Sequence, residues 1–258
     1  MLTVIAVALT FASGAMDVAS FTRLGNVFTS VMTGNIVLWG LAAARGSLTL
    51  ASHTAVAIVG YIAGVAGGSR IAVGARAAAD ADGAGGGENG DTRPGEGRAG
   101  AWPAHITWAL LAELALLGGF AVGWEITGAK PGGWGQFCLL AVAAAGMGVQ
   151  SSAVKNMGLT EVSTTYLTGT LTGLISSLVG PGPRATDRWR RLGVLLGLAA
   201  GASLTGLLVA TAPDGVPALP LAALITCVVL ASWPRAAGQA RRKTRAVREA
   251  RGEKGGAR

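Results

Sequence analysis

The chain has 258 residues, of which 51% are hydrophobic and only 13% are charged, well below the roughly 25% that soluble domains carry. This composition excludes an ordinary soluble domain and predicts an integral membrane protein. The net charge of +8 does not indicate a nucleic-acid partner, because nine of the 21 Lys and Arg residues follow Trp233 and four more lie between Arg184 and Arg191.

Membrane-spanning helices are predicted from runs of about twenty mostly apolar residues, the length that crosses roughly 30 Å of hydrocarbon. These runs lack the alternation of barrel strands, so the predicted fold class is all-α and polytopic, with about eight transmembrane helices. The first run has no basic segment before it, and we expect a retained helix there rather than a cleaved signal. The eight runs are approximately Leu2–Phe21, Val27–Ala44, Leu48–Gly68, Ala104–Trp124, Gln136–Val154, Val162–Val179, Leu192–Thr211 and Val216–Trp233.

Two segments fall outside the predicted spans. Residues 72–103 are rich in Gly and Ala, a composition that does not bury a core, and predict a flexible loop. Residues 235–258 form a basic tail, which the positive-inside rule places in the cytoplasm of a bacterial cell whose plasma membrane the chain spans. With eight spans both termini lie inside and the loop 72–103 lies outside; a seven-span arrangement is the alternative. The tail either anchors this topology or also binds anionic lipid headgroups, at about 1 kcal/mol per basic residue.

A weak internal repeat organises the spans. Asp17-Val18-Ala19-Ser20 aligns with Gln150-Ser151-Ser152-Ala153 at a spacing of 133 residues, and Thr33-Gly34 aligns with Thr168-Gly169 at a spacing of 135. A duplicated unit follows, with spans 1–3 in residues 1–71, span 4 in 104–128, and spans 5–8 in 129–234. Four spans per unit is an even number, so we expect two parallel four-helix repeats in the same membrane orientation.

The motifs of both halves resemble a known family. They are Gly14-Ala15-Met16-Asp17, Leu24-Gly25-Asn26-Val27-Phe28, Met32-Thr33-Gly34-Asn35, Gly148-Val149-Gln150 and Thr164-Thr165-Tyr166-Leu167-Thr168-Gly169-Thr170-Leu171. This pattern resembles the YoaK-type family of bacterial integral membrane proteins, a domain of unknown function. The resemblance covers nearly the whole chain and implies a membrane location, but no particular chemistry.

Two acidic residues, Asp17 and Glu113, are expected inside spans, where a charged group costs about 2.5 to 3.5 kcal/mol even on permissive insertion scales. Asp17 lies near the end of its run, where it either caps the following turn or takes part in function. Glu113 falls midway along its run, so we expect it to face the bundle interior, to be protonated, or to pair. The alternative for Glu113 is a neutral packing role. Desolvation would suit either acid to reversible proton binding.

The Thr-Gly stretches have two interpretations. Small residues let helices approach closely, with threonine hydroxyls bonded across the interface or to their own turn. Alternatively, Gly34 and Gly169 mark loosened helices whose polar groups line a substrate cavity near a pseudo-symmetry axis. On the second interpretation the substrate-binding candidates are Asp17, Thr33, Gly34, Asn35, Glu113, Gln150, Thr164, Thr168, Gly169 and Thr170.

The leading functional hypothesis is transport of a small solute, with proton coupling through Glu113 or Asp17 as an option. A non-transporting membrane scaffold and an intramembrane enzyme are the alternatives. The enzyme is disfavoured, because the sequence has no metal-ligand cluster, nucleophile elbow or phosphate loop. The two histidines, His53 and His105, lie near span starts and are expected to be interfacial. We therefore expect neither a metal nor a cofactor.

Overall fold

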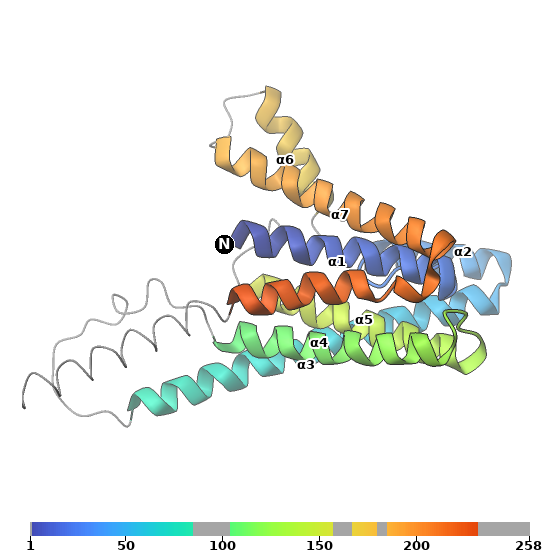
Figure 1. Ribbon diagram of the computed structural model, residues 1–258, viewed down its shortest axis with the longest axis horizontal. Helices are drawn as coiled ribbons and strands as arrows, with labels where there is room; N and C mark the ends of the chain where they lie inside the picture. Colours follow the sequence, from blue (N-terminus) through green and yellow to red (C-terminus); the bar gives the residue numbers. More distant parts are fainter. Residues whose placement is uncertain (1, 85–103, 157–166, 180–184, 232–258) are drawn as a thin grey trace, which may run out of the picture.

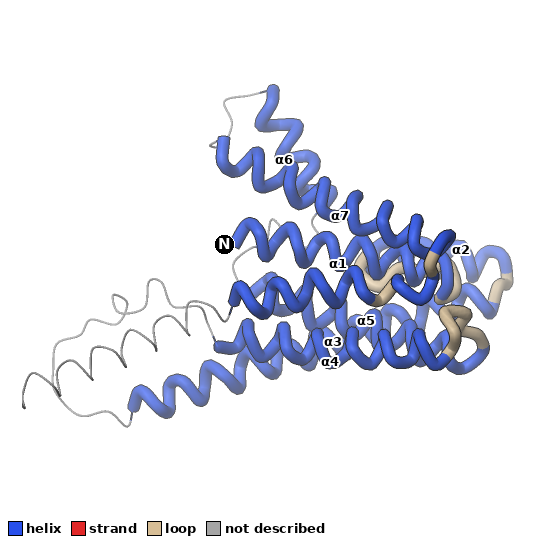
Figure 2. The backbone as a smooth tube through the Cα atoms, in the orientation of Figure 1, coloured by secondary structure: helices blue, strands red, loops and turns tan. Residues whose placement is uncertain are grey.

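The computed structural model describes residues 2–84, 104–156, 167–179 and 185–231 of the chain. In these ranges all regular structure is helical, as Figure 2 shows. A last helix covers residues 218–231. The labelled helices are α1 (Leu2–Arg23), α2 (Met32–Arg45), α3 (Leu48–Ala84), α4 (Ala104–Ile126), α5 (Gly133–Asn156), α6 (Leu167–Val179), α7 (Ala185–Thr211) and the 3-10 turn η3 (Pro213–Gly215).

Six of the described helical segments are long and apolar enough to cross a membrane, rather than the eight predicted. Helices α2 and α6 have 14 and 13 residues and rise only about 20 Å, too little for a span. The run that begins at Val27 loses its first residues to a loop. Gly25 and Asn26 turn the chain with φ of 95° and 59°, and α2 starts only at Met32. The six spanning segments are Leu2–Arg23, Leu48–Ala75, Ile106–Ile126, Gly133–Asn156, Arg188–Thr211 and Pro213–Ala231.

Helix directions follow from contacts along each interface. Gln136, early in α5, bonds the carbonyl of Arg23 at the end of α1, whereas Gln150, late in α5, bonds that of Leu9. Helix α5 therefore runs antiparallel to α1 (Figure 1). The expectation of two parallel repeats is wrong in its orientation, because the chain crosses the bundle three times before α5, in α1, α3 and α4, and not four times.

The side of the long loop changes for the same reason, because only two helices, α1 and α3, cross the bundle before it. The end of α3 and the start of α4 lie at the same end of the bundle as the start of α1 (Figure 1). The predicted loop 72–103 was expected on the side opposite the termini, and these flanking ends place it on the same side instead. Its first dozen residues continue α3 to Ala84, and residues 85–103 lie outside the described part of the chain.

Two helix pairs pack with backbone against backbone at glycines. A Cβ at any of these glycines would meet a carbonyl oxygen of the facing helix, so only glycine permits the approach. Between α1 and α7, Gly14 faces Leu198 O, Gly201 faces Phe11 O and Gly197 faces Val7 O. Between α5 and α3, Gly148 faces Tyr61 O, Gly64 faces Ala145 O and Gly60 faces Ala141 O. Every contact of the first pair thus recurs in the second, displaced by 134 residues from α1 to α5 and by 137 from α3 to α7.

We predict that Gly64→Ala and Gly201→Ala each destabilise the protein by about 1–3 kcal/mol, because the added methyl group overpacks a backbone contact. Gly67→Ala, three residues further along α3, is the control, since nothing lies within 4 Å of a Cβ there. Thermal unfolding of the purified protein in detergent measures the differences. Equal stability of Gly64→Ala and Gly67→Ala would contradict the packing described.

We also predict the topology of the six-span bundle. Reporter fusions after Gly90 and after Ala240 should both report the cytoplasm, since the basic tail marks that side. A fusion at Gly46, in the turn between α2 and α3, should report the opposite side. Opposite locations for Gly90 and Ala240 would mean that α6, the short helix between them, crosses the membrane after all.

Candidate functional site

Asp17 lies about one and a half turns before the end of α1 and binds the loop that precedes α2. One carboxylate oxygen, Oδ1, accepts from the backbone N–H of Thr29 at 2.9 Å, the Thr29 hydroxyl at 3.0 Å and the N–H of Ser30 at 2.8 Å. The other, Oδ2, accepts from the Ser30 hydroxyl at 2.5 Å. Asp17 is thus a structural anchor for the start of α2.

Asn35 fixes the same loop from the other side. Its amide donates to the carbonyl of Phe28 at 2.6 Å, and its Oδ1 accepts from the N–H of Phe28 at 2.9 Å. The Ser20 hydroxyl donates to the carbonyl of Val27 at 2.8 Å. Asn35 is completely buried, and its polar atoms are occupied by the chain itself. The structure therefore brings Asp17 and Asn35 together around residues 27–30.

Thr33-Gly34 lies in the first turn of α2, so the first Thr-Gly motif begins a short helix, whereas the sequence suggested that it breaks a long one. Thr168-Gly169 lies in the first described turn of α6, and the residues just before it, 157–166, lie outside the described part of the chain. Gly34 packs against Phe28, while a Cβ at Gly169 would meet nothing within 4 Å. In Figure 1, α6 lies beside the first half of α7. Thr170 is buried, and the remaining candidate of this group, Thr164, lies outside the described residues.

Gln150 joins α5 to α1 in the middle of the bundle. Its Nε2 donates to the carbonyl of Leu9 at 3.0 Å and to the hydroxyl of Ser13 at 2.9 Å. Ser13 is one helical turn before Asp17, so Gln150, Asp17 and Asn35 form a succession of polar groups along α1. The Oε1 atom of Gln150 is buried and has no hydrogen-bond partner.

Glu113 is completely buried in α4, and neither of its carboxylate oxygens has a hydrogen-bond partner. It interrupts a stripe of fully buried apolar side chains at helical spacing, made up of Ile106, Leu110, Leu117, Phe120 and Trp124. The thiol of Cys227, in the last helix, lies within the range of the Glu113 charge and contacts the carbonyl of Ile5 at 3.7 Å. The side chain of Glu113 therefore points into the bundle, among α1, α5 and the last helix.

A hydrogen-bonded network around His53 was not anticipated from the sequence. The ring atoms Nδ1 and Nε2 lie 2.7 Å from Thr49 O and 3.1 Å from Gln136 Oε1, and Gln136 Nε2 donates to Arg23 O at 2.9 Å. The ring also covers Gly25, at the position that a Cβ would occupy. His53 is thus buried where α1, α3 and α5 meet, near the start of α3 as the sequence placed it. The sequence feature that could have indicated this network is Gln136, a polar residue at the start of an apolar run.

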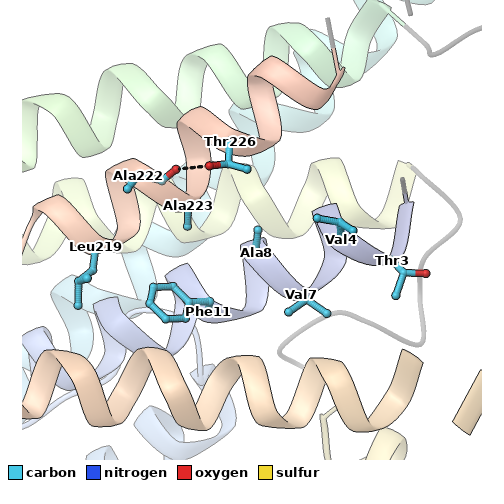
Figure 3. Close-up of a pocket in the computed structure, with 9 residues that line it drawn as sticks. All are labelled: Thr3, Val4, Val7, Ala8, Phe11, Leu219, Ala222, Ala223 and Thr226. Atoms are coloured by element: carbon cyan, nitrogen blue, oxygen red, sulfur yellow. Dashed lines mark hydrogen bonds between the residues drawn. The ribbon is translucent and has the colours of Figure 1, made fainter. Parts of the chain in front are cut away.

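A groove of about 530 Å³ lies between α1 and the last helix (Figure 3). Its lining is apolar apart from two threonines, and Thr226 bonds the carbonyl of Ala222 within its own helix. None of the candidate substrate-binding residues lines it. The lining residues are Thr3, Val4, Val7, Ala8, Phe11, Leu219, Ala222, Ala223 and Thr226. This groove suits an apolar occupant and is not the polar cavity that the sequence interpretation expected.

Comparison with known proteins agrees with the family resemblance. Residues 5–232 match the family model described as "Protein of unknown function (DUF1275)". The chain is 31% identical over 168 residues to the "UPF0700 transmembrane protein YoaK" of Bacillus subtilis (strain 168), across 65% of this chain and 63% of that protein. The alignment thus spans less than two thirds of the relative's length. No solved structure matches the chain.

We predict that Asp17→Ala lowers the stability of the protein by about 3 kcal/mol or more, because four donors of the loop lose their charged acceptor. The control is Thr22→Ala near the end of α1, whose exposed hydroxyl bonds only carbonyls of its own helix. Thermal unfolding in detergent measures both variants. If Asp17→Ala were as stable as Thr22→Ala, the anchoring role of Asp17 would be wrong.

Proposed function

The chain belongs to the DUF1275 family of membrane proteins of unknown function, and on this premise we propose that it transports a small solute across the membrane by means of two inverted halves. We propose no catalytic role and place the protein in the plasma membrane. The basic tail, residues 235–258, lies outside the described residues, and its contact with anionic lipids remains part of this proposal.

The observation that carries the proposal is the pair of equivalent glycine interfaces. Their constant displacements superpose α1 on α5 and α3 on α7, while α1 and α5 run in opposite directions. Two copies of one unit, inverted in the membrane, account for both facts. The glycine contacts favour a spacing of 134 residues between α1 and α5 instead of the 133 used in the sequence alignment. With this spacing Gly14 corresponds to Gly148 and Ala19 to Ala153.

The short helices add to this argument. Each unit then consists of a long helix, a short helix that begins with a Thr-Gly motif, and two further long helices. Inverted repeats with interrupted helices are a recurrent plan of secondary transporters, whose substrates and coupling ions bind near the middle of the membrane. Glu113 and Gln150 supply polar groups in the middle of the bundle, and Asp17 and Asn35 supply them beside the start of α2; lipid would not tolerate these groups without a reason.

A membrane scaffold is the second candidate, and one observation favours it. Asp17 and Asn35 are hydrogen-bonded to the loop before α2 and offer no free groups to a solute. On that view the polar groups stabilise an irregular chain and nothing passes through the protein. Glu113, which has no such bonds, favours transport with proton coupling.

The test is a metabolite uptake screen in reconstituted vesicles, with and without a pH gradient. We predict uptake of at least one small solute that increases with the gradient, and loss of this increase in Glu113→Gln. Glu125→Gln is the matched control, since Glu125 is an exposed acid on the same helix. If uptake changed neither with the pH gradient nor in Glu113→Gln, the proposal of proton coupling would be wrong. If no tested solute were taken up, the result would favour the scaffold.

A further inference from the structure

We infer that Glu113 and Gln150 form a proton-binding pair, in which the carboxyl group of Glu113 holds the proton and donates it as an O–H to Gln150 Oε1. The inference deepens the proposed function by assigning its proton site, and its role in transport rests on that function. The inference that the two side chains pair is argued from the packing of α4 against α5.

The two side chains lie at the same level of adjacent helices. Helices α4 and α5 are antiparallel, since a Cβ at Gly146 would lie 3.3 Å from Leu117 Cδ2, and one at Gly123 would contact Leu139. Glu113 lies four residues before Leu117 in α4, and Gln150 lies four residues after Gly146 in α5. Residues four apart share one face of a helix, so both side chains project from the faces that meet.

The unpartnered atoms of the two residues are chemically complementary. Both oxygens of Glu113 and Oε1 of Gln150 are buried acceptors without a donor. An ionised carboxylate only accepts hydrogen bonds, and an amide oxygen has no hydrogen to donate. With Glu113 ionised, both of its oxygens and Gln150 Oε1 therefore have no hydrogen-bond donor. One added proton turns one Glu113 oxygen into a donor for Gln150 Oε1. Both side chains are long enough to adjust by rotation about their χ angles.

The surroundings provide no other charge for an ionised Glu113. The stretches that enclose it are uncharged in sequence: residues 2–16 of α1, 48–69 of α3, 106–124 of α4 apart from Glu113 itself, 133–154 of α5 and the last helix. Their titratable side chains are His53 and Tyr61 of α3, Cys138 of α5 and Cys227 of the last helix. His53 is held at the far end of the bundle by Thr49 and Gln136. An unpaired buried charge costs far more than a neutral, hydrogen-bonded carboxylic acid.

Asp17 does not compete for this role. Its four hydrogen bonds all come from donors, two of them backbone N–H groups that cannot accept a proton in return. The hydrogen-bond partners therefore distinguish the two acids that the sequence left as equivalent options: the oxygens of Asp17 are used by the loop before α2, whereas those of Glu113 have no partner. Asp17 serves as an anchor, and Glu113 carries the exchangeable proton.

The pair also connects the proton to the contact between the two halves. In the proposed pair Gln150 Oε1 accepts from Glu113, while Nε2 of the same amide donates to Leu9 O and Ser13 Oγ of α1. Removal of the proton places a carboxylate against an amide oxygen, and Gln150 relieves the repulsion only by turning its amide away from α1. Proton release thereby weakens a bond between α5 and α1, which belong to different halves.

Infrared difference spectroscopy of the protein in vesicles, without any solute, tests the pair. An un-ionised carboxyl group gives a C=O stretching band that is separate from the carboxylate bands and moves in heavy water. We expect this band at neutral pH in the wild type, its loss in Glu113→Gln, and its retention in the control Glu125→Gln. Gln150→Leu should keep the band but move it to higher wavenumber, because the hydrogen bond to Oε1 is gone.

Retention of the whole band in Glu113→Gln, or no band shift in Gln150→Leu, would overturn the inference. If Glu113→Gln does not fold, Glu113→Asp replaces it. The shorter acid should keep the band and move it to higher wavenumber, and an unmoved band would count against the pair. The spectra need no transport, so a failed uptake screen with the expected bands would refute the proposed function and leave the proton site in place.

Discussion

The hydrogen bonds that Asp17 and Asn35 make to residues 28–30 are the interactions on which the rest of the architecture depends. Lipid offers no partners to peptide groups, so a chain that leaves the helical conformation at membrane depth needs them from the protein itself. Asp17 supplies acceptors to two N–H groups, and Asn35 serves both the N–H and the C=O of Phe28. With these bonds the chain can turn back beside α1 and begin α2 late.

The late start of α2 decides the direction of α5. A helix of 14 residues does not cross the membrane, so in the described residues α1, α3 and α4 make three crossings and α5 then runs opposite to α1. Glycine contacts of the same geometry join α1 to α7 and α5 to α3. In the proposed arrangement of two inverted halves, each of these interfaces contains one helix from each half, so the halves interlock.

The polar groups of the interior fall into two kinds with different uses. Asp17, Asn35 and His53 have their bonding capacity taken up by nearby chain, which makes them supports for loop and helix ends. The two oxygens of Glu113 and Oε1 of Gln150 are buried and have no hydrogen-bond partner. A protein keeps such unpaired groups in its core at considerable cost, and for this reason they are better guides to function than the satisfied ones.

The sequence by itself determined that this is an all-helical membrane protein, located its long helices, and singled out Asp17, Asn35, Glu113 and Gln150, although α3 continues to Ala84 instead of ending near Gly68 and α7 begins at Ala185 instead of Leu192. Those conclusions rest on the apolar content of each segment and on the cost of burying a polar group, and both can be read residue by residue from the sequence. Only the tertiary structure decided that α2 is too short to span, that α5 opposes α1, and that Asp17 is satisfied while Glu113 is not. Each of these depends on hydrogen bonds and close contacts between residues distant in sequence, such as Asp17 with Ser30 or Gly14 with Leu198, and hydropathy and spacing do not record which groups meet.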